Sequence, residues 1–329
     1  MINKNIYKYH INDLSNYSFL VTGGAGFIGS NIVKYLIKHN AGLVRVIDNF
    51  SNGYIENIRE FLDLPNFSLI EGDIRNIDNC RLALKKIDYV SHQAALGSVP
   101  RSISDPIKSN EVNISGFLNI LNEVKSSKSV KRFVYAASSS TYGDSISLPK
   151  VEGEEGKPLS PYAITKLVNE LYAEIYSSTY NFHSIGLRYF NVFGPNQNEN
   201  NPYAAVIPIF CKAFIENEQP VINGDGLTSR DFTFVENVVQ ANIKALFCDN
   251  LNKHEVFNVA CGNQISLNEL INYLQKISGK KIIPKYREER IGDVKHSKAC
   301  INKIKSLLNY HPNFDFKEGI KITYNWYKT

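Results

Sequence analysis

The stretch SFLVTGGAGFIG, from Ser18 to Gly29, decides the fold. It begins as an apolar strand and continues with Gly23, Gly26 and Gly29 at the spacing GxxGxxG, directly before a segment of helical period. Glycines at such a turn permit a sharp bend, let a pyrophosphate approach the main chain, and leave N–H groups open at the positive end of the helix. The stretch therefore predicts a dinucleotide-binding βα unit.

Strand-like segments recur after this unit, and segments of helical period separate them. They lie at 43–47, 67–70, 87–90 and 132–137, and they lead into Asp48, Asp73, His92 and Ser138. Such alternation is typical of a parallel sheet with helices on both faces. We predict an α/β fold of the Rossmann type, with a doubly wound parallel sheet.

The second predicted strand indicates which dinucleotide is bound. Asp48 follows Gly29 by 19 residues, and a carboxylate there can accept hydrogen bonds from the adenosine ribose hydroxyls. The same carboxylate would repel a 2′-phosphate, which favours NAD over NADP. Arg45 could serve a phosphate, but its position inside the strand favours a structural role. Asp73 could meet the adenine amine, and we interpret His92 as structural.

A second constellation indicates hydride chemistry at a carbon that bears a hydroxyl. Tyr162 and Lys166 are one helical turn apart, and Ser138 ends a predicted strand. A tyrosine with an ordinary pKa of about 10 is a poor base at neutral pH. We expect the Lys166 ammonium, together with the positive nicotinamide ring, to lower the pKa of Tyr162. Ser138 can hydrogen-bond the same substrate oxygen.

Regular alternation loosens after about residue 180, where proline and glycine break the chain into short pieces. We predict an NAD-binding domain over residues 1–186 and a smaller C-terminal α/β substrate domain over residues 187–329. A strand near 256–260 is expected to return to the main sheet. Residues 1–17 are expected to precede the first strand, with a short surface helix.

Composition excludes several classes of protein. Lys and Arg exceed Asp and Glu by 37 to 32, and no basic run interleaved with aromatics suggests nucleic acid. Five widely spaced cysteines without a CxxC pair argue against a zinc site or a disulfide framework. The polar N-terminus and the absence of a long apolar run favour a cytoplasmic protein that does not cross a membrane.

Beyond these motifs, the chain resembles extended short-chain dehydrogenases/reductases, and within that family nucleotide-sugar 4-epimerases. The resemblance runs from about Phe19 to about Trp326 and includes HQAA from His92 and GLRYFNVFGP from Gly186 to Pro195. The most similar subgroup is that of bacterial UDP-N-acetylglucosamine 4-epimerases, which act mainly on N-acetylated sugars. The resemblance implies tightly bound NAD, a UDP-sugar substrate and a homodimer.

The resemblance also implies the residues of the site. Tyr162 resembles the catalytic base, Lys166 the residue that lowers the pKa of this base, and Ser138 its hydrogen-bond partner. These three are the predicted catalytic residues. Cofactor contacts are implied for Gly23, Gly26, Phe27, Ile28, Gly29, Asp48, Asn49, Phe50, Ser51, Gly53, Asp73, Ile74, Gln93, Ala94, Ala95, Tyr162, Lys166 and Tyr189. Substrate contacts are implied for Gly97, Ser98, Ser138, Ser139, Ser140, Tyr162, Asn191, Ala205, Val206, Val221, Asn223, Arg230, Arg290, Asp293 and Ser297. No metal is expected.

Two features of the sequence indicate the reaction and the sugar within this family. Similar dehydratases and decarboxylases carry a carboxylate just after the catalytic hydroxyl residue, whereas Ser139, Ser140 and Thr141 stand here, which favours an epimerase. Ser297 falls where members that reject N-acetyl groups carry a bulky tyrosine, which predicts conversion of UDP-GlcNAc to UDP-GalNAc and back.

Other readings remain open. One is a 4-epimerase of UDP-glucose or of a UDP-uronic acid, with Arg101 as the candidate for a C6 carboxylate. Another is a net ketone reductase that releases NADH. A third is a non-catalytic NAD-binding redox sensor, which the presence of both Tyr162 and Lys166 disfavours.

Overall fold

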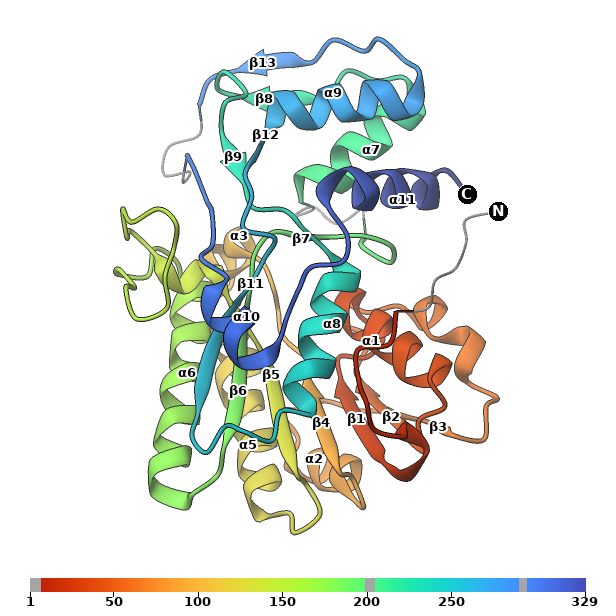
Figure 1. Ribbon diagram of the computed structural model, residues 1–329, viewed down its shortest axis with the longest axis vertical. Helices are drawn as coiled ribbons and strands as arrows, with labels where there is room; N and C mark the ends of the chain where they lie inside the picture. Colours follow the sequence, from red (N-terminus) through yellow and green to blue (C-terminus); the bar gives the residue numbers. More distant parts are fainter. Residues whose placement is uncertain (1–6, 199–204, 290–294) are drawn as a thin grey trace.

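A seven-stranded parallel sheet forms the centre of the molecule (Figure 1). The computed structural model describes residues 7–198, 205–289 and 295–329. In spatial order the strands are β11 (Glu255–Val259), β6 (Ser184–Tyr189), β5 (Arg132–Ser138), β4 (Tyr89–His92), β1 (Ser18–Thr22), β2 (Leu43–Asp48) and β3 (Phe67–Glu71). The chain moves outward from β1 to β3 and then returns to the other side of β1, so the strand order reverses between β1 and β4. This arrangement confirms the predicted doubly wound α/β fold, and sheets of this kind bind ligands beyond the reversal point.

Two helical layers cover the sheet, because neighbouring residues of each strand point to opposite faces. Phe19 and Val21 contribute to one apolar core, and Leu20 contributes to the other. The first layer consists of α1 (Phe27–Lys38) and α8 (Val235–Leu246), and the second consists of α2 (Ile77–Leu84), α5 (Phe117–Ser126) and α6 (Pro161–Tyr180). Between β4 and α5 lie the short helices α3 (Val99–Ser104) and α4 (Pro106–Asn110), followed by the π-helical turn η4 (Glu111–Gly116).

Residues 7–17, the described part of the segment before β1, differ from the expected surface helix. They include the 3-10 turn η1 (Leu14–Asn16), and Tyr9 and Leu14 are buried against the first layer. The Tyr9 backbone N–H donates to the Tyr35 hydroxyl of α1 at 2.7 Å. Apolar side chains in this polar segment therefore fix it to the core. Further 3-10 turns are η2 (Ile55–Asn57), η3 (Arg59–Phe61) and η5 (Ser139–Tyr142).

Strand β6 has a sequence that does not look like a buried strand, because it contains Gly186 and Arg188. Both residues have a packing role. A Cβ at Gly186 would lie 2.6 Å from the Tyr135 hydroxyl oxygen on β5. The Arg188 guanidinium is buried and forms ion pairs with Glu155 and Glu170, which balance its charge.

A smaller unit packs over one end of the sheet (Figure 1). Its apolar core joins α7, α9 and α11, with Phe193, Phe210, Phe234, Leu270 and Ile320 at the centre. Its helices are α7 (Val206–Glu216), α9 (Leu267–Ser278) and α11 (Phe316–Lys328), and α10 (Asn302–Leu308) lies beside β11. Its strand pairs are β10 (Thr233–Phe234) with β7 (Val192–Phe193), β12 (Ile265–Ser266) with β9 (Ser229–Arg230), and β13 (Lys285–Arg287) with β8 (Val221–Asn223). Between these segments the chain returns to the sheet as α8 and β11.

Asn258 on β11 is a buried junction between segments that lie far apart in sequence. Its side-chain oxygen accepts from the Tyr142 hydroxyl at 2.8 Å. Its amide nitrogen donates to the carbonyls of Lys150 at 3.0 Å and Cys300 at 3.1 Å. The loop that precedes α6 and the segment that contains Ser297 are thereby tied to the same strand.

In the three ranges that the structure describes, no helix has both the length and the apolar character needed to cross a bilayer.

Replacing Asn258 with alanine should lower the free energy of unfolding by about 2–4 kcal/mol, because buried polar groups lose their partners. Tyr142→Phe, which removes one of the three hydrogen bonds, should cost about 1 kcal/mol. Urea denaturation of the two variants and the wild type measures both values. Equal stability of Asn258→Ala and the wild type would contradict the junction.

Candidate active site

One cavity lies at the carboxyl ends of the strands, around the point where the strand order reverses. All predicted cofactor residues except Phe50 line it. From the predicted substrate set, Gly97, Ser138, Tyr162 and Ala205 line the same cavity. Phe50 adopts a left-handed backbone with φ of 54°, and its ring packs against the apolar core instead. The structure thus brings together residues from the carboxyl ends of six strands, β1 to β6.

The glycine-rich loop fits a pyrophosphate. Gly23 has a φ of 65°, and a Cβ there would lie 2.8 Å from the backbone of Ala94. A Cβ at Gly29 would lie 2.2 Å from the carbonyl oxygen of Gly23. Helix α1 begins after Gly26 without a side-chain cap, and residues 26–29 line the cavity. Such a turn matches the needs of a diphosphate group.

Asp48 ties this loop to the end of β2. Its two carboxylate oxygens accept from the backbone N–H groups of Ala25 and Phe50, each at 2.9 Å. Burial raises the pKa of Asp48, and the backbone hydrogen bonds oppose that rise. Each oxygen keeps a second lone pair for a ribose hydroxyl. Arg45 donates to the carbonyls of Ala83 and Lys85, which fits its structural interpretation.

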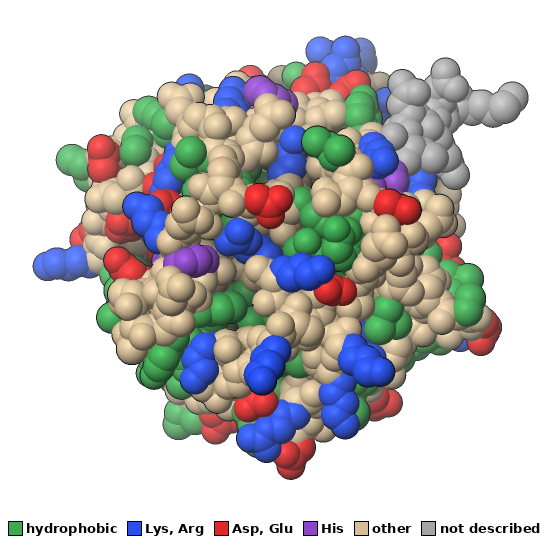
Figure 2. All heavy atoms as spheres, turned by 60° about the horizontal axis from the view of Figure 1, so that its bottom comes forward, with side chains coloured by type: hydrophobic (Ala, Val, Ile, Leu, Met, Phe, Trp, Pro, Cys, Tyr) green, Lys and Arg blue, Asp and Glu red, His purple; other side chains and the backbone are tan. Residues whose placement is uncertain are grey.

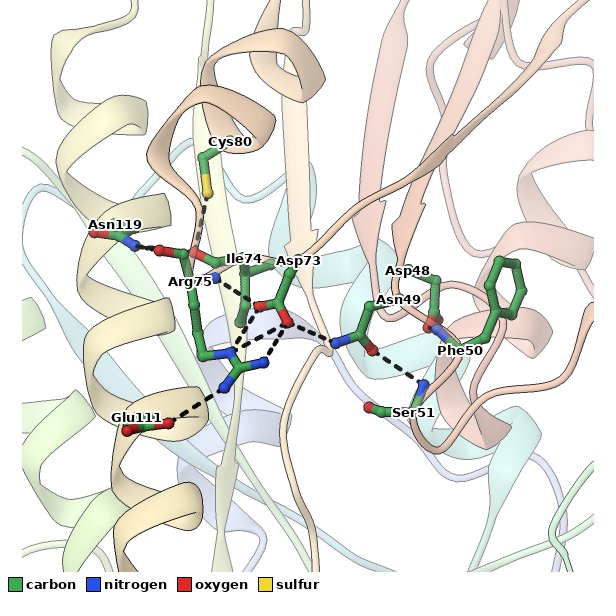
Figure 3. A network of polar contacts seen from close by, with 10 residues as sticks. All are labelled: Asp48, Asn49, Phe50, Ser51, Asp73, Ile74, Arg75, Cys80, Glu111 and Asn119. Atoms are coloured by element: carbon green, nitrogen blue, oxygen red, sulfur yellow. Dashed lines mark hydrogen bonds and ion pairs between the residues drawn. The ribbon is translucent and has the colours of Figure 1, made fainter.

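The far end of the cavity is bounded by the ends of β2 and β3 (Figure 3). There Asp73 accepts hydrogen bonds from the side chain of Asn49 at 2.8 Å and from the side chain and backbone of Arg75. Asp73 and Asn49 both line the cavity, and their contact with a cofactor stays a prediction.

Ser138, Tyr162 and Lys166 meet at the opposite end. Ser160 caps α6 by accepting from the Ala163 N–H at 3.1 Å, and the Tyr162 N–H donates to the Ser102 hydroxyl at 3.0 Å. These contacts fix the first turn of the helix. Ser138 accepts from the backbone N–H and the hydroxyl of Ser140, so its own hydroxyl proton is available for Tyr162.

Burial and hydrogen bonding affect the pKa values of Tyr162 and Lys166. Burial raises the pKa of Tyr162, and the hydrogen bond from Ser138 opposes this rise. The Lys166 ammonium donates to the Ala136 carbonyl at 2.7 Å. Burial lowers the pKa of Lys166 to about 8, against the attraction of Glu170. In the protein alone, Ser138 therefore favours the phenolate. The joint effect of Lys166 and the nicotinamide ring concerns the protein with its cofactor and stays a prediction.

Two buried asparagines that the sequence did not single out support the cavity wall. Asn242 of α8 donates to the Tyr189 hydroxyl at 2.8 Å and accepts from the Gln93 amide at 3.1 Å. Asn113, in the π-helical turn, accepts from the Leu96 N–H at 2.8 Å and donates to the Thr165 hydroxyl at 3.1 Å. No local sequence pattern indicates either residue, because both segments contain several other polar residues.

His92, interpreted as structural, is buried, and its Nδ1 lies 2.8 Å from the Thr22 hydroxyl. Burial lowers its pKa to about 3, so its imidazole is neutral.

The remaining substrate candidates lie in and near the smaller unit. Asn191 donates to the Asp231 carbonyl at 3.3 Å, and the Ser297 N–H donates to the Ser229 carbonyl at 3.1 Å. Arg230 donates to that same carbonyl at 2.9 Å, so Arg230 and Ser297 are held side by side. Val206 begins α7, Val221 and Asn223 lie in β8, Ser98 caps α3, and Ser139 and Ser140 lie in η5. Arg290 and Asp293 lie outside the described residues.

Comparisons with known proteins agree with this geometry. The family model for the NAD dependent epimerase/dehydratase family matches residues 19–260. A putative UDP-glucose 4-epimerase of Methanocaldococcus jannaschii is 37% identical over 311 residues, which cover 94% of this chain and 98% of that protein.

Solved structures give the same result. The UDP-N-acetylglucosamine 4-epimerase of Methanobrevibacter ruminantium M1, in complex with UDP-N-acetylmuramic acid, is 40% identical with a TM-score of 0.89 over 94% of this chain and 98% of that one. The UDP-glucuronic acid 4-epimerase of Bacillus cereus, in complex with UDP-glucuronic acid and NAD, is 32% identical with a TM-score of 0.87 over 94% and 99%. The chain therefore belongs to the NAD-dependent epimerase/dehydratase family of extended short-chain dehydrogenases/reductases.

Proposed function

We propose that this protein interconverts UDP-GlcNAc and UDP-GalNAc. The chain is an NAD-dependent UDP-sugar 4-epimerase, and the choice of an N-acetylated sugar is the finer step that we propose. The observation that carries this choice is the small side chain of Ser297, which is held beside Arg230 by their shared hydrogen-bonding partner, the Ser229 carbonyl. A side chain of this size leaves room for an acetamido group.

We assign the proton transfer to Tyr162, with Ser138 as its partner. Tyr162 accepts the proton of the sugar 4-hydroxyl and later returns it, while the Ser138 hydroxyl stabilises the phenolate and the sugar oxygen. Lys166, which lies in the same cavity wall, is placed to contact the nicotinamide ribose. When bound, NAD⁺ supplies the hydride acceptor and donor. The glycine-rich loop and Asp48 hold the diphosphate and the ribose.

The residues beside Ser138 support epimerisation over elimination. Ser139, Ser140 and Thr141 follow it in η5 and carry hydroxyl groups, whereas removal of a proton from C5 of the sugar would need a carboxylate at this place. Without such a base, the proton and hydride removed from the sugar are returned to it.

The substrate diphosphate is assigned to Arg230 and Asn191. A guanidinium group binds phosphate oxygens through a planar fork of donors. Asn191 has a left-handed backbone with φ of 36°, which turns the chain after β6 toward the smaller unit. Ala205, at the N-terminus of α7, lines the cavity on that side.

Relatives that act on other UDP-sugars provide the alternative, because the Bacillus cereus structure contains UDP-glucuronic acid. Arg101 of α3 is the candidate for a C6 carboxylate. Its Nη2 donates to the Asn52 side chain at 3.2 Å, which directs it to the loop after β2. This contact does not favour a uronic acid. UDP-glucose lacks the acetamido group and remains the simpler competitor.

Tyr162→Phe should lower kcat by about 10²–10⁴-fold, because it removes the proton acceptor. Ser138→Ala should also lower kcat, since the phenolate loses its hydrogen bond. Initial rates with UDP-GlcNAc measure both effects. Tyr172→Phe, on the same helix, is the control that should keep the wild-type rate, and wild-type turnover by Tyr162→Phe would rule out the assignment.

Ser297→Tyr should reduce kcat/KM for UDP-GlcNAc by about ten-fold or more while sparing UDP-Glc, because the phenol fills the space of the acetamido group. Ser297→Ala keeps that space and should retain the wild-type preference. Steady-state kinetics with both sugars decide the matter. An equal loss on both substrates would contradict a steric role for Ser297.

We also propose a homodimer formed through α5 and α6. Ile164, Leu171 and Ile175 lie on one face of α6 and are 51%, 51% and 58% exposed, which is unusual for a cluster of aliphatic side chains. Ile175→Asp should convert the dimer into a monomer, as measured by light scattering after size exclusion. Ile146→Asp, on an exposed loop, should remain dimeric. A monomeric wild type would refute the proposed interface.

A further inference from the structure

Arg75 does not line the cofactor cavity, but its side chain binds Asp73, which does (Figure 3). Asp73 lines the cavity, whereas Arg75 and Glu111 lie with Asp73 around a separate shallow hollow beside it. The Arg75 side chain holds both carboxylate oxygens, with Nε 3.1 Å from Oδ1 and Nη2 2.8 Å from Oδ2. The Arg75 backbone N–H donates to Oδ1 at 2.8 Å. A two-pronged contact of this kind fixes the plane of the carboxylate.

The same arginine links three chain segments at this end of the cavity. Its Nη1 donates to Glu111 of the π-helical turn at 3.2 Å, and the following residue, Val112, lines the cavity. The Asn119 amide of α5 holds the Arg75 carbonyl at 3.0 Å, and Asn49 from the end of β2 donates to Asp73. These contacts fix the position of the Asp73 carboxylate relative to the end of β2 and to the π-helical turn.

Stability alone does not account for this network. The side chains of Arg75, Asp73 and Glu111 are 40%, 24% and 51% exposed, and ion pairs in such surroundings contribute little to folding. These contacts have a clear effect on the pKa of Asp73. Hydrogen bonding by the Arg75 side chain is the main cause that lowers the pKa of Asp73 to about 2. An aspartate is ionised at neutral pH even without this shift and acts only as an acceptor, so what Arg75 adds at neutral pH is the fixed orientation of the carboxylate.

We propose that Arg75 is a positioning residue that makes the dinucleotide site selective for adenine, by holding the Asp73 carboxylate as an acceptor for the exocyclic amine. An amine offers protons to this carboxylate. A hypoxanthine base carries a carbonyl oxygen at the same place, and two acceptors that face each other repel. The inference rests on the proposed NAD-dependent function and on the expectation that Asp73 meets the adenine amine.

Competition between two dinucleotides tests this role. The holoenzyme is equilibrated with equal concentrations of NAD⁺ and nicotinamide hypoxanthine dinucleotide, desalted and denatured, and the released cofactors are quantified by mass spectrometry. The wild type should retain NAD⁺ in preference by about ten- to a hundred-fold, the range expected for one hydrogen bond to a charged group. Arg75→Gln should lower this preference by about ten-fold, and Arg75→Lys should fall between the two.

Arg81→Gln is the matched control. Arg81 is 57% exposed and also pairs with two carboxylates, Asp78 and Glu123, but it lies on α2 outside the cavity lining. Arg81→Gln should keep the wild-type preference. The inference is overturned if Arg75→Gln selects between the dinucleotides as the wild type does, or if the wild type does not discriminate. A wild type that retains neither dinucleotide would contradict the NAD site itself.

Discussion

The close approach of backbone segments at the glycine-rich loop is the constraint on which the rest of the site depends. Gly23 lies so near Ala94, and Gly29 so near Gly23, that no side chain fits at either position. This contact places the N-terminus of α1 directly beside the end of β4. Asp48 then binds the loop through the Ala25 N–H, so the ends of β1, β2 and β4 form one rigid wall. A dinucleotide that lies along this wall reaches Tyr162 at one end and Asp73 at the other.

At the end of the cavity that contains Tyr162 and Lys166, the pKa values depend on burial as well as on residue type. Lys166 is buried and Tyr162 is half-buried at the cavity wall; this desolvation raises the pKa of the tyrosine and lowers that of the lysine. Each shift disfavours the charged form, so the site gains from a partner that stabilises charge. Ser138 acts as such a partner for Tyr162. The Lys166 ammonium is anchored on the Ala136 carbonyl, in the strand that ends at Ser138, which keeps the two catalytic segments together.

Much of this cavity could be predicted from the sequence, because the glycine spacing and the Tyr162–Lys166 pair each lie within a short stretch of the chain. The glycine-rich loop, Asp48 and the Tyr162–Lys166 pair line one cavity. Their contacts with a cofactor stay a prediction. Strand β6 was not predicted, since Gly186 and Arg188 obscure its apolar pattern and acquire their role only from Tyr135, Glu155 and Glu170. The supporting asparagines, Asn242 and Asn113, were missed for the same reason. Their partners are distant in sequence, and no local pattern indicates them.

We propose that the protein regenerates its cofactor in each turnover on an N-acetylated sugar. An NMR time course tests this proposal. Purified protein is mixed with UDP-GlcNAc without added cofactor. We expect UDP-GalNAc signals to grow to a constant ratio with UDP-GlcNAc. Unchanged UDP-GlcNAc, in a sample that converts UDP-Glc under the same conditions, would contradict it.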